Sequence, residues 1–419
     1  MSEKHPPFRP TEILMPEKNI PLETWACVAC DQYTSQPEYW ERVEEIVGDH
    51  PSTLRLMLPE CYLADSEARV PKIHAAMAEY LEKGLLYPAV QNGFVFCRRT
   101  TAAGTRIGLV GAVDLEEYDY SSGSSPLIRP TEQTIAERLP PRLKIRRGAP
   151  VELSHILILI DDPERTVLEP LNARAEAFRK LYDFDLMQGG GHLAGYAVDS
   201  AEDVQAVEAA LAALKEKLGE NPMLLAVGDG NHSLATAKAA WDEIREGLSP
   251  EERENHPARF ALCEIENIHD EALLFEPIHR LITGTTPEEL YECWEKYAEE
   301  REMSIGEDGV GHVFQMAIRR DEYPVVVRNP EGEIPCETIQ LFLDEFLHNH
   351  PEARIDYIHG ADVLRKLAQA KDAVGFILPP INKKSFFEDV QKLGVLPRKT
   401  FSMGEAHEKR YYMECRKII

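Results

Sequence analysis

Along the chain, segments in which hydrophobic residues recur at helical spacing alternate with short apolar segments of strand length. Apolar residues recur at helical spacing in three early segments, residues 38–49, 69–86 and 200–219. Apolar runs of strand length also occur, at residues 94–100, 106–115 and 155–160. Helices that alternate with strands pack as layers around a sheet, so this pattern predicts an α/β (α+β) fold.

The segment around residues 223–241 shows this alternation most compactly. The helix over residues 200–219 begins at a Ser200-x-x-Asp203 cap, and the apolar run Met223–Gly228 follows it. The letters DGNHS then form a polar turn, and an alanine-rich helix is predicted from there to about residue 244. Helix, strand, turn and helix therefore follow one another directly.

The second part of the chain again mixes helices and strands. Strands are predicted at residues 259–267, 312–320 and 322–329, and helices at residues 287–300 and 360–370. A chain of 419 residues is longer than one core usually serves. We therefore predict an N-terminal α/β region over residues 1–260 that carries the DGNHS turn. A C-terminal α/β subdomain over residues 261–419 would follow, and its tail would complete the site.

Composition and charge narrow the class of partner. The chain has 46 Lys and Arg residues against 72 Asp and Glu, and its net charge of −26 opposes nucleic acid and anionic membranes. No apolar run reaches the roughly 20 residues of a membrane span, and the first residues lack the apolar segment of a secretory signal. Eight scattered cysteines indicate reduced, buried thiols. We expect a cytoplasmic protein that binds small molecules, and a homodimer is compatible with the sequence.

The DGNHS turn has the composition of an anion site. A turn between a strand and a helix offers backbone N–H groups at the positive end of the helix dipole. Gly230 allows a ligand to approach closely, while Asn231, His232 and Ser233 add hydrogen-bonding side chains. Asp229 would repel an anion unless it held a divalent cation, so phosphate with Mg²⁺ accounts for every residue of the turn. The simpler interpretation is a helix whose first turn is capped by Asn231 or Ser233.

The same turn carries a family resemblance. It resembles the Asp-Gly-His-His-Arg signature of the domain of unknown function 1015 family. Further matching stretches are residues 29–40, 51–60, 128–134, 186–196, 276–282 and 396–412. The turn is also similar to the phosphate-gripping element of the ParB/sulfiredoxin superfamily, which includes free-serine kinases. Here Asn231 and Ser233 stand where His and Arg are usual. The Arg guanidinium that would bind phosphate through two hydrogen bonds is therefore missing.

The resemblance implies both a fold and an activity. The fold would be a ParB/sulfiredoxin-like core enlarged by a second α/β subdomain. The activity would be that of a small-molecule kinase that phosphorylates L-serine, with a nucleotide or pyrophosphate as donor.

The missing basic charge has two candidate sources. The tail segment PRKTFS offers two cations and two hydroxyls, and a second basic pair follows Pro277. The residues assigned to the donor phosphates from these segments are Arg398, Lys399, Thr400, Ser402, His279 and Arg280. Alternatively, the tail segment is a basic strand that pairs with acidic neighbours and does not bind phosphate.

Phosphoryl transfer to a hydroxyl also needs a carboxylate near the attacking oxygen. Glu132 in RPTEQT is the first candidate, and it matches the family's His-Glu-x-Thr pattern except that Thr131 replaces the His. Alternatively, Glu132 has no catalytic role and is simply a residue in the first turn of a helix that is capped by a Thr. Asp31, at the end of an apolar stretch, is the second candidate. The residues expected to bind the acceptor are Asp31, Arg129, Thr134 and His407.

Three hypotheses follow from these features. The first is a Mg²⁺-dependent phosphotransferase with Glu132, Asp229 and His232 as catalytic residues, Asp229 as metal ligand and L-serine as the acceptor that the resemblance implies. The second is a regulatory protein that binds phosphate or a nucleotide without catalysis. The third is a phosphoester hydrolase, in which water replaces the acceptor. No GxxxxGK[ST] motif occurs, which excludes a P-loop kinase.

Overall fold

The structure is a computed structural model that describes residues 6–121, 123–135 and 138–419. It divides into two compact units: unit 1 comprises Met1–Leu274 with Gly404–Ile419, and unit 2 comprises Phe275–Met403. Both units mix helices and strands, which confirms the α/β class. The predicted boundary at residue 261 differs from this division, because the strand over Phe260–Asn267 lies inside the sheet of unit 1 and the last residues return to that unit.

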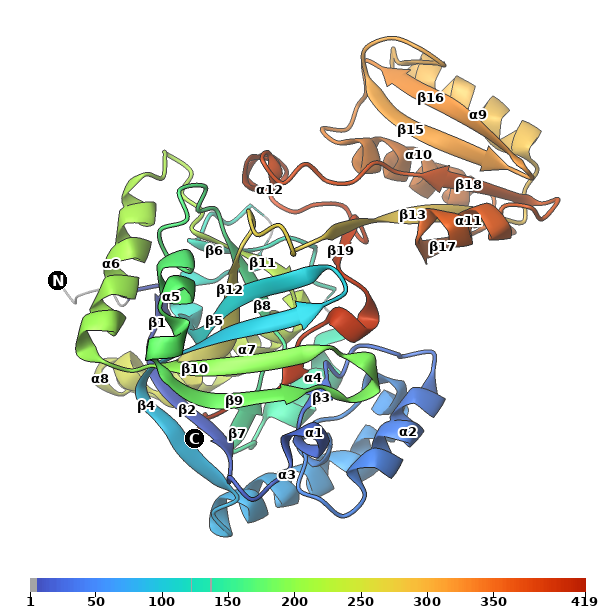
Figure 1. Ribbon diagram of the computed structural model, residues 1–419. Coiled ribbons are helices and arrows are strands. Elements are labelled where there is room, and N and C mark those ends of the chain that lie inside the picture. Colours follow the sequence, from blue (N-terminus) through green and yellow to red (C-terminus); the bar gives the residue numbers. More distant parts are fainter. Residues whose placement is uncertain (1–5, 122, 136–137) are drawn as a thin grey trace. The chain divides into compact units, whose positions relative to one another are not determined.

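The core of unit 1 is a long mixed sheet (Figure 1). From one edge to the other, the order is β6 (Ile128–Pro130), β11 (Leu225–Asp229), β8 (Leu157–Ile160), β12 (Phe260–Asn267), β5 (Gly104–Asp114), β4 (Leu86–Thr101), β2 (Thr11–Pro16), β21 (Cys415–Lys417) and β7 (Val151–Leu153). Outside this path, β1 (Phe8–Arg9) pairs with β5, and β10 (His192–Val198) joins β4 to β9 (Arg179–Asp185). A separate small ladder pairs β20 (Tyr411–Tyr412) with β3 (Cys27–Val28).

The central strands of this sheet are apolar on both sides, so both faces of the sheet need to be covered. Along β4, Phe94 and Phe96 belong to one hydrophobic core, while Val95 and Cys97 belong to another. Successive side chains of a strand point to opposite faces, so the two cores lie on opposite sides of the sheet.

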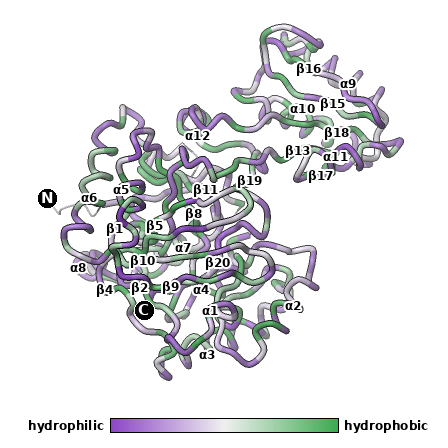
Figure 2. The backbone as a smooth tube through the Cα atoms, viewed as in Figure 1, coloured by the Kyte–Doolittle hydropathy of each residue, from purple (hydrophilic) through white to green (hydrophobic). Residues whose placement is uncertain are grey.

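Helices supply the outer layers of unit 1. The helices are α1 (Leu22–Trp25), α2 (Pro37–Val47), α3 (Ser66–Glu82), α4 (Leu139–Arg146), α5 (Glu169–Ala173), α6 (Ala201–Glu216), α7 (Asn231–Arg245) and α8 (Pro250–Asn255). Trp40 of α2 and Met77 of α3 enter the core of Val95, and Leu211 of α6 and Trp241 of α7 enter the core of Phe94. Along α2 and α3, hydrophobic and hydrophilic residues alternate (Figure 2), as the helical spacing predicts.

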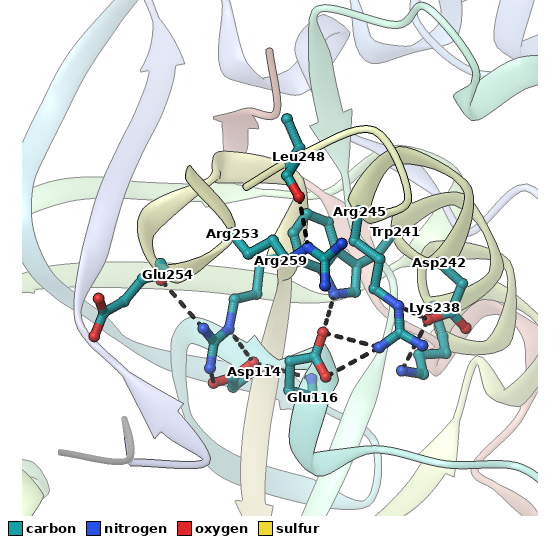
Figure 3. A network of polar contacts seen from close by, with 10 residues as sticks. All are labelled: Asp114, Glu116, Lys238, Trp241, Asp242, Arg245, Leu248, Arg253, Glu254 and Arg259. Carbon is teal, nitrogen blue, oxygen red and sulfur yellow. Dashed lines mark hydrogen bonds and ion pairs between the residues drawn. The ribbon is translucent and has the colours of Figure 1, made fainter. Parts of the chain in front are cut away.

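Helix α7 is fastened at its C-terminal half by a polar network (Figure 3). The Trp241 indole N–H donates to Glu116 Oε1 at 2.6 Å, and Arg245 Nη1 lies 3.1 Å from the same oxygen. Arg259 pairs with buried Asp114 at 2.7 Å. Because Glu116 lies just after β5, its contacts with Trp241 and Arg245 fix α7 against the sheet, while the Asp114–Arg259 pair ties the end of β5 to the turn before β12.

Unit 2 is a smaller α/β unit with its own core around Trp294. Its sheet has the order β14 (Ser304–Gly306), β16 (Asp321–Arg328), β15 (His312–Ile318), β18 (Ala373–Ile377), β13 (Phe275–Thr283) and β17 (Arg354–His359), and β19 (Phe401–Met403) pairs with the start of β13. Its helices are α9 (Pro287–Glu300), α10 (Pro335–Asn349), α11 (Ala361–Leu367) and α12 (Phe386–Leu393).

Two general expectations can be compared with the structure. All eight cysteines are free thiols, as predicted, but only five are buried, because Cys30, Cys61 and Cys293 are partly exposed. Among the described residues, none of the helices is long and apolar enough to cross a bilayer.

Candidate functional site

The DGNHS residues span the junction between β11 and α7: Asp229 ends the strand, Gly230 makes the turn, and Asn231, His232 and Ser233 begin the helix. Gly230 has a left-handed backbone (φ 82°), and a Cβ at this position would lie 3.1 Å from the Cα of Ile156. Both constraints favour glycine. No side chain in the described ranges caps the start of α7, a helix of 15 residues. The turn therefore presents the positive end of a helix dipole, which is the geometry of an anion site.

The turn lies beside the segment that follows β6. The strands β6 and β11 are parallel, with Val227 opposite Pro130, so the chain leaves both at the same edge of the sheet. Asn231 Oδ1 accepts the Thr131 N–H at 3.0 Å, and the Thr131 hydroxyl donates to the Val227 carbonyl at 2.6 Å. Asn231 is buried. In the structure, Asn231 therefore fastens the DGNHS turn to the RPTEQT segment.

His232 faces this same segment. The Ile135 N–H donates to His232 Nε2 over 3.4 Å, which makes this nitrogen an acceptor and leaves the proton of the neutral ring on Nδ1. Glu132 is half-buried and directly follows Thr131, and Thr134 lies three residues after Thr131. The structure thus brings the RPTEQT and DGNHS segments together, while the catalytic roles assigned to their residues stay predictions.

Asp229 is paired with a buried lysine from the C-terminal tail. Its Oδ2 lies 3.3 Å from Lys409 Nζ, and its Oδ1 accepts the Gly230 N–H at 2.9 Å. The Lys409 side chain is 8% exposed. Lys409 was not among the predicted site residues, although the matching stretch 396–412 contains it. It places a positive charge at the turn whose usual Arg is replaced by Ser233.

The pairing of β20 with β3 fixes the position of Lys409. Tyr411 lies opposite Val28, and the Ala29 N–H donates to the Arg410 carbonyl at 2.9 Å. The buried Arg410 guanidinium also binds the Glu264 and Glu414 carboxylates. Strand pairing therefore holds the backbone of Arg410, and buried ion pairs hold its side chain. Lys409 is the preceding residue, so its position is fixed as well.

A cluster of polar residues surrounds the buried ring of His155. Ser233 Oγ lies 3.2 Å and Asp31 Oδ2 lies 3.8 Å from His155 Nε2, and the Tyr412 hydroxyl lies 2.7 Å from Nδ1. Burial alone would raise the pKa of Asp31, but His155 and Lys409 hold this pKa below its ordinary value. Asp31 is therefore ionised at neutral pH and can accept a proton from a bound hydroxyl.

Two other predicted residues of unit 1 have contacts of their own. Arg129 is buried, and its guanidinium donates to the Pro126 carbonyl at 3.0 Å and to the Asn221 side chain at 2.5 Å. These contacts give Arg129 a structural role, because they tie β6 to the turn that precedes β11. The carbonyl of His407 accepts a hydrogen bond from Arg99 at 3.0 Å.

The other residues assigned to donor phosphates belong to unit 2. Arg398 is exposed and pairs with Asp344 at 2.9 Å, and Lys399 has a left-handed backbone (φ 55°). The Thr400 hydroxyl donates to the Pro397 carbonyl at 2.5 Å. Ser402 lies on β19, opposite Glu276 of β13.

His279 and Arg280 are buried on β13. Nδ1 of His279 accepts the Leu378 N–H at 3.1 Å, and burial, reinforced by Arg280, lowers the pKa of His279 to about 4. The ring is therefore neutral at pH 7 and adds no charge. The Arg280 guanidinium donates to the side chains of Gln340 and Cys336 and to the carbonyls of Ile278, Arg398 and Lys399. These contacts tie the PRKTFS segment to β13 and α10.

Asp229 is the predicted metal ligand. Among the described residues, no three His, Cys, Asp or Glu side chains are grouped so that they could hold a metal ion. One carboxylate is sufficient for Mg²⁺ where substrate phosphates and water supply the other oxygens. In the structure the Asp229 carboxylate is paired with Lys409, and its role as a Mg²⁺ ligand stays a prediction.

Comparisons with known proteins give distant structural matches and one family. A free serine kinase variant in complex with AMP is 12% identical, with a TM-score of 0.39, over 73% of this chain and 90% of that chain. SbnI with a C-terminal truncation, from Staphylococcus aureus, is 11% identical, with a TM-score of 0.37, over 70% of this chain and 81% of that chain. A conserved hypothetical protein from Pyrococcus furiosus is 13% identical, with a TM-score of 0.35, over 73% of this chain and 94% of that chain. A search of curated proteins found no match. The family model described as a protein of unknown function (DUF1015) matches residues 8–346, which is most of the chain, and the protein therefore belongs to this family.

Proposed function

We propose that this protein is a phosphotransferase that moves a phosphoryl group from pyrophosphate or a nucleotide to the hydroxyl of a small metabolite. The observation that carries the proposal is the position of Lys409, a buried cation at the start of α7 that contacts Asp229 and stabilises the ionised form of Asp31. L-serine is the acceptor that the family resemblance suggests.

The donor phosphates would bind at the start of α7. The helix dipole and the Lys409 ammonium both favour negative charge there, and backbone N–H groups at the start of the helix can donate to phosphate oxygens. Ser233 adds a hydroxyl to the same turn. Binding of a donor would replace the contact between Lys409 and Asp229 by contacts of Lys409 with phosphate oxygens.

Two carboxylates compete for the role of proton acceptor. Asp31 is ionised and lies in the His155 cluster, while Glu132 follows Thr131 in the segment beside the turn. We favour Asp31, because His155 and Lys409 stabilise its ionised form beside the start of α7. In a loose transition state the base accepts the proton late, so a low pKa does not exclude this role.

The reaction needs one bond exchange. The acceptor oxygen forms a bond to the transferred phosphorus while the bond between that phosphorus and its leaving oxygen breaks, and the hydroxyl proton passes to the carboxylate. Bound Mg²⁺, held by Asp229 and the donor phosphates, would neutralise the charge of the leaving group. The protein's part is to position both substrates and to exclude water from the site.

The proposal is tested by phosphorus NMR of mixtures that contain the protein, Mg²⁺, one donor (pyrophosphate, ADP or ATP) and one acceptor, with L-serine first. Lys409→Met should lower the transfer rate by about 100-fold or more, because it removes a preorganised cation from the donor phosphates. Lys417→Met is the matched control, since Lys417 lies in the same tail, has an exposed side chain and lies 3.8 Å from Glu12 rather than at the DGNHS turn. Equal activity of the Lys409→Met variant and the wild-type protein would refute the proposal.

A second pair of variants separates the two carboxylates. If Asp31 is the base, Asp31→Asn should abolish transfer and Glu132→Gln should retain most of it; the reverse result would assign the role to Glu132. Phosphate release that does not depend on an acceptor would indicate hydrolysis instead. Donor binding without any turnover would favour a regulatory protein.

A further inference from the structure

Unit 1 contains a cavity of about 130 Å³ that reaches the first turn of α7. Its wall includes the segment between α2 and α3, the helices α3 and α4, and the strand β7 with the residues that follow it. Most of this wall is apolar, with side chains from Leu56, Met57, Leu58, Leu63, Met77 and Ile145. A ligand that enters the cavity therefore meets hydrocarbon over most of its surface.

The charged side chains of the cavity wall are paired with each other. Glu60 is bound by Arg142, and Glu152 lies 2.7 Å from Arg146. Two carboxylates and two guanidinium groups together contribute no net charge. A further charged group buried here would lose its hydration without gaining a partner. The part of a ligand that occupies the cavity should therefore be uncharged.

One end of the cavity offers hydrogen bonds. Ser233 and His155 both line it, with Ser233 Oγ 3.2 Å from His155 Nε2. Thr236 lines the same end, but its hydroxyl already donates to the His232 carbonyl at 2.7 Å. Ser233 is also part of the DGNHS turn. A hydroxyl that extends from the cavity toward Ser233 would thus approach the place where the donor phosphates are proposed to bind.

The size of the cavity limits the apolar part of the ligand. A cavity of about 150 Å³ lined by aliphatic and aromatic residues is large enough for benzene. The cavity beside Ser233 is slightly smaller, at about 130 Å³, and it is open at one side. Free serine, whose side chain has a single CH₂ group and whose backbone carries two charges, would leave the apolar wall unfilled and would place charge in a region without net charge.

We propose that this cavity binds the uncharged apolar part of an alcohol of about benzyl alcohol size, with the hydroxyl directed toward Ser233 and His155. Such an alcohol is the acceptor class of the proposed transfer, and this second statement rests on the proposed function. The acceptor hydroxyl would then lie near both the phosphate site at α7 and the carboxylate of Asp31.

Binding is tested by NMR of protein labelled with ¹³C in the methionine methyl groups. Met57 and Met77 line the cavity, while Met303 and Met316 belong to unit 2 and serve as internal controls. Benzyl alcohol should shift the Met57 and Met77 signals in a saturable manner and leave the two controls in place. It should bind about fivefold more tightly than toluene, because one hydrogen bond to Ser233 is added.

Two variants make this test specific. Ser233→Ala should remove the preference for benzyl alcohol over toluene while toluene binding is retained. Leu63→Trp should fill the cavity and weaken the binding of both probes at least tenfold. Leu81→Trp is its matched control, since Leu81 is a half-buried leucine of α3 outside the cavity wall. Unchanged Met57 and Met77 signals at saturating probe, or equal binding by the Leu63→Trp variant, would overturn the inference.

Transfer assays distinguish this inference from the proposed function. Phosphorylation of benzyl alcohol that is lost in the Leu63→Trp variant and kept in the Leu81→Trp variant supports both. Phosphorylation of L-serine with no effect of Leu63→Trp supports the proposed function and overturns the acceptor class. Saturable probe binding without transfer to any acceptor supports the binding site and refutes the proposed function, and the acceptor role with it.

Discussion

At the scale of single residues, the sequence identifies those parts of the site that lie close together along the chain. Asp229, Gly230 and Ser233 are recognisable because a polar turn interrupts two apolar segments. His155 and Lys409 are not recognisable in this way. His155 lies in the short segment between β7 and β8, next to an apolar run, and Lys409 is brought to Asp229 by the pairing of β20 with β3. Long-range contacts of this kind leave no local pattern in a single sequence.

Gly230 allows a prediction at this scale. Gly230→Ala should lower the free energy of unfolding by about 1–2 kcal/mol, because alanine disfavours a left-handed backbone. The added Cβ would also lie 3.1 Å from Ile156 Cα. Gly219→Ala is the control, since no atom lies within 4 Å of a Cβ there. Urea unfolding measures both values, and a Gly230→Ala protein as stable as the control would contradict the assigned backbone geometry.

At the scale of helices and strands, periodicity predicts elements well where a segment is amphipathic and long. The helix expected over residues 200–219 is α6 (Ala201–Glu216), and the helix expected after the turn is α7 (Asn231–Arg245). The apolar stretch that ends at Asp31 forms only the short strand Cys27–Val28. Its partner is β20, almost four hundred residues later in the chain, so local propensity could not define its length.

Arg280 allows a prediction at the scale of elements. Its guanidinium joins β13 to the PRKTFS segment and to α10, and lysine cannot reproduce this planar set of donors. Arg280→Lys should therefore destabilise unit 2 by about 2–3 kcal/mol. Hydrogen exchange measured by mass spectrometry should show faster exchange in residues 275–403 and unchanged exchange in unit 1.

The matched control is Arg398→Lys in the same segment. The Arg398 side chain is 56% exposed and pairs with exposed Asp344, so this variant should change stability by less than about 0.5 kcal/mol. Equal exchange in the two variants would argue against a structural role of Arg280.

At the scale of the whole molecule, the number of units follows from chain length, but the division between them does not. β12 lies between β8 and β5 in the sheet of unit 1, although the predicted boundary at residue 261 cuts through it after its first residue. The residues Gly404–Ile419 return to unit 1 after unit 2 is complete. Sequence order alone gives no reason for this return. It is decided by the pairing of β21 with β2 and β7 and by the buried ion pairs of Arg410.

The buried charges of β12 make the stability of unit 1 depend on pH. Glu266 is 1% exposed, and burial raises its pKa to about 7, although Arg106 lies 3.0 Å away and opposes this shift. The folded protein therefore binds a proton at Glu266 in a pH range in which the unfolded chain has released it. The contribution is fully present below the ordinary pKa of 4.5 and is lost as the pH rises through about 7.

Glu266→Gln removes this titration and keeps the shape of the side chain. The unfolding free energy of the variant relative to wild type should rise between about pH 5 and about pH 8, by up to about 3 kcal/mol. Tryptophan fluorescence during urea unfolding reports unit 1 alone in a Trp294→Phe background, because Trp25, Trp40 and Trp241 all lie in that unit. Glu202→Gln, at an exposed position of α6, should show a constant difference over the same pH range. A pH-independent difference for Glu266→Gln would mean that this carboxyl is ionised in the folded protein throughout, and that Arg106 outweighs the effect of burial.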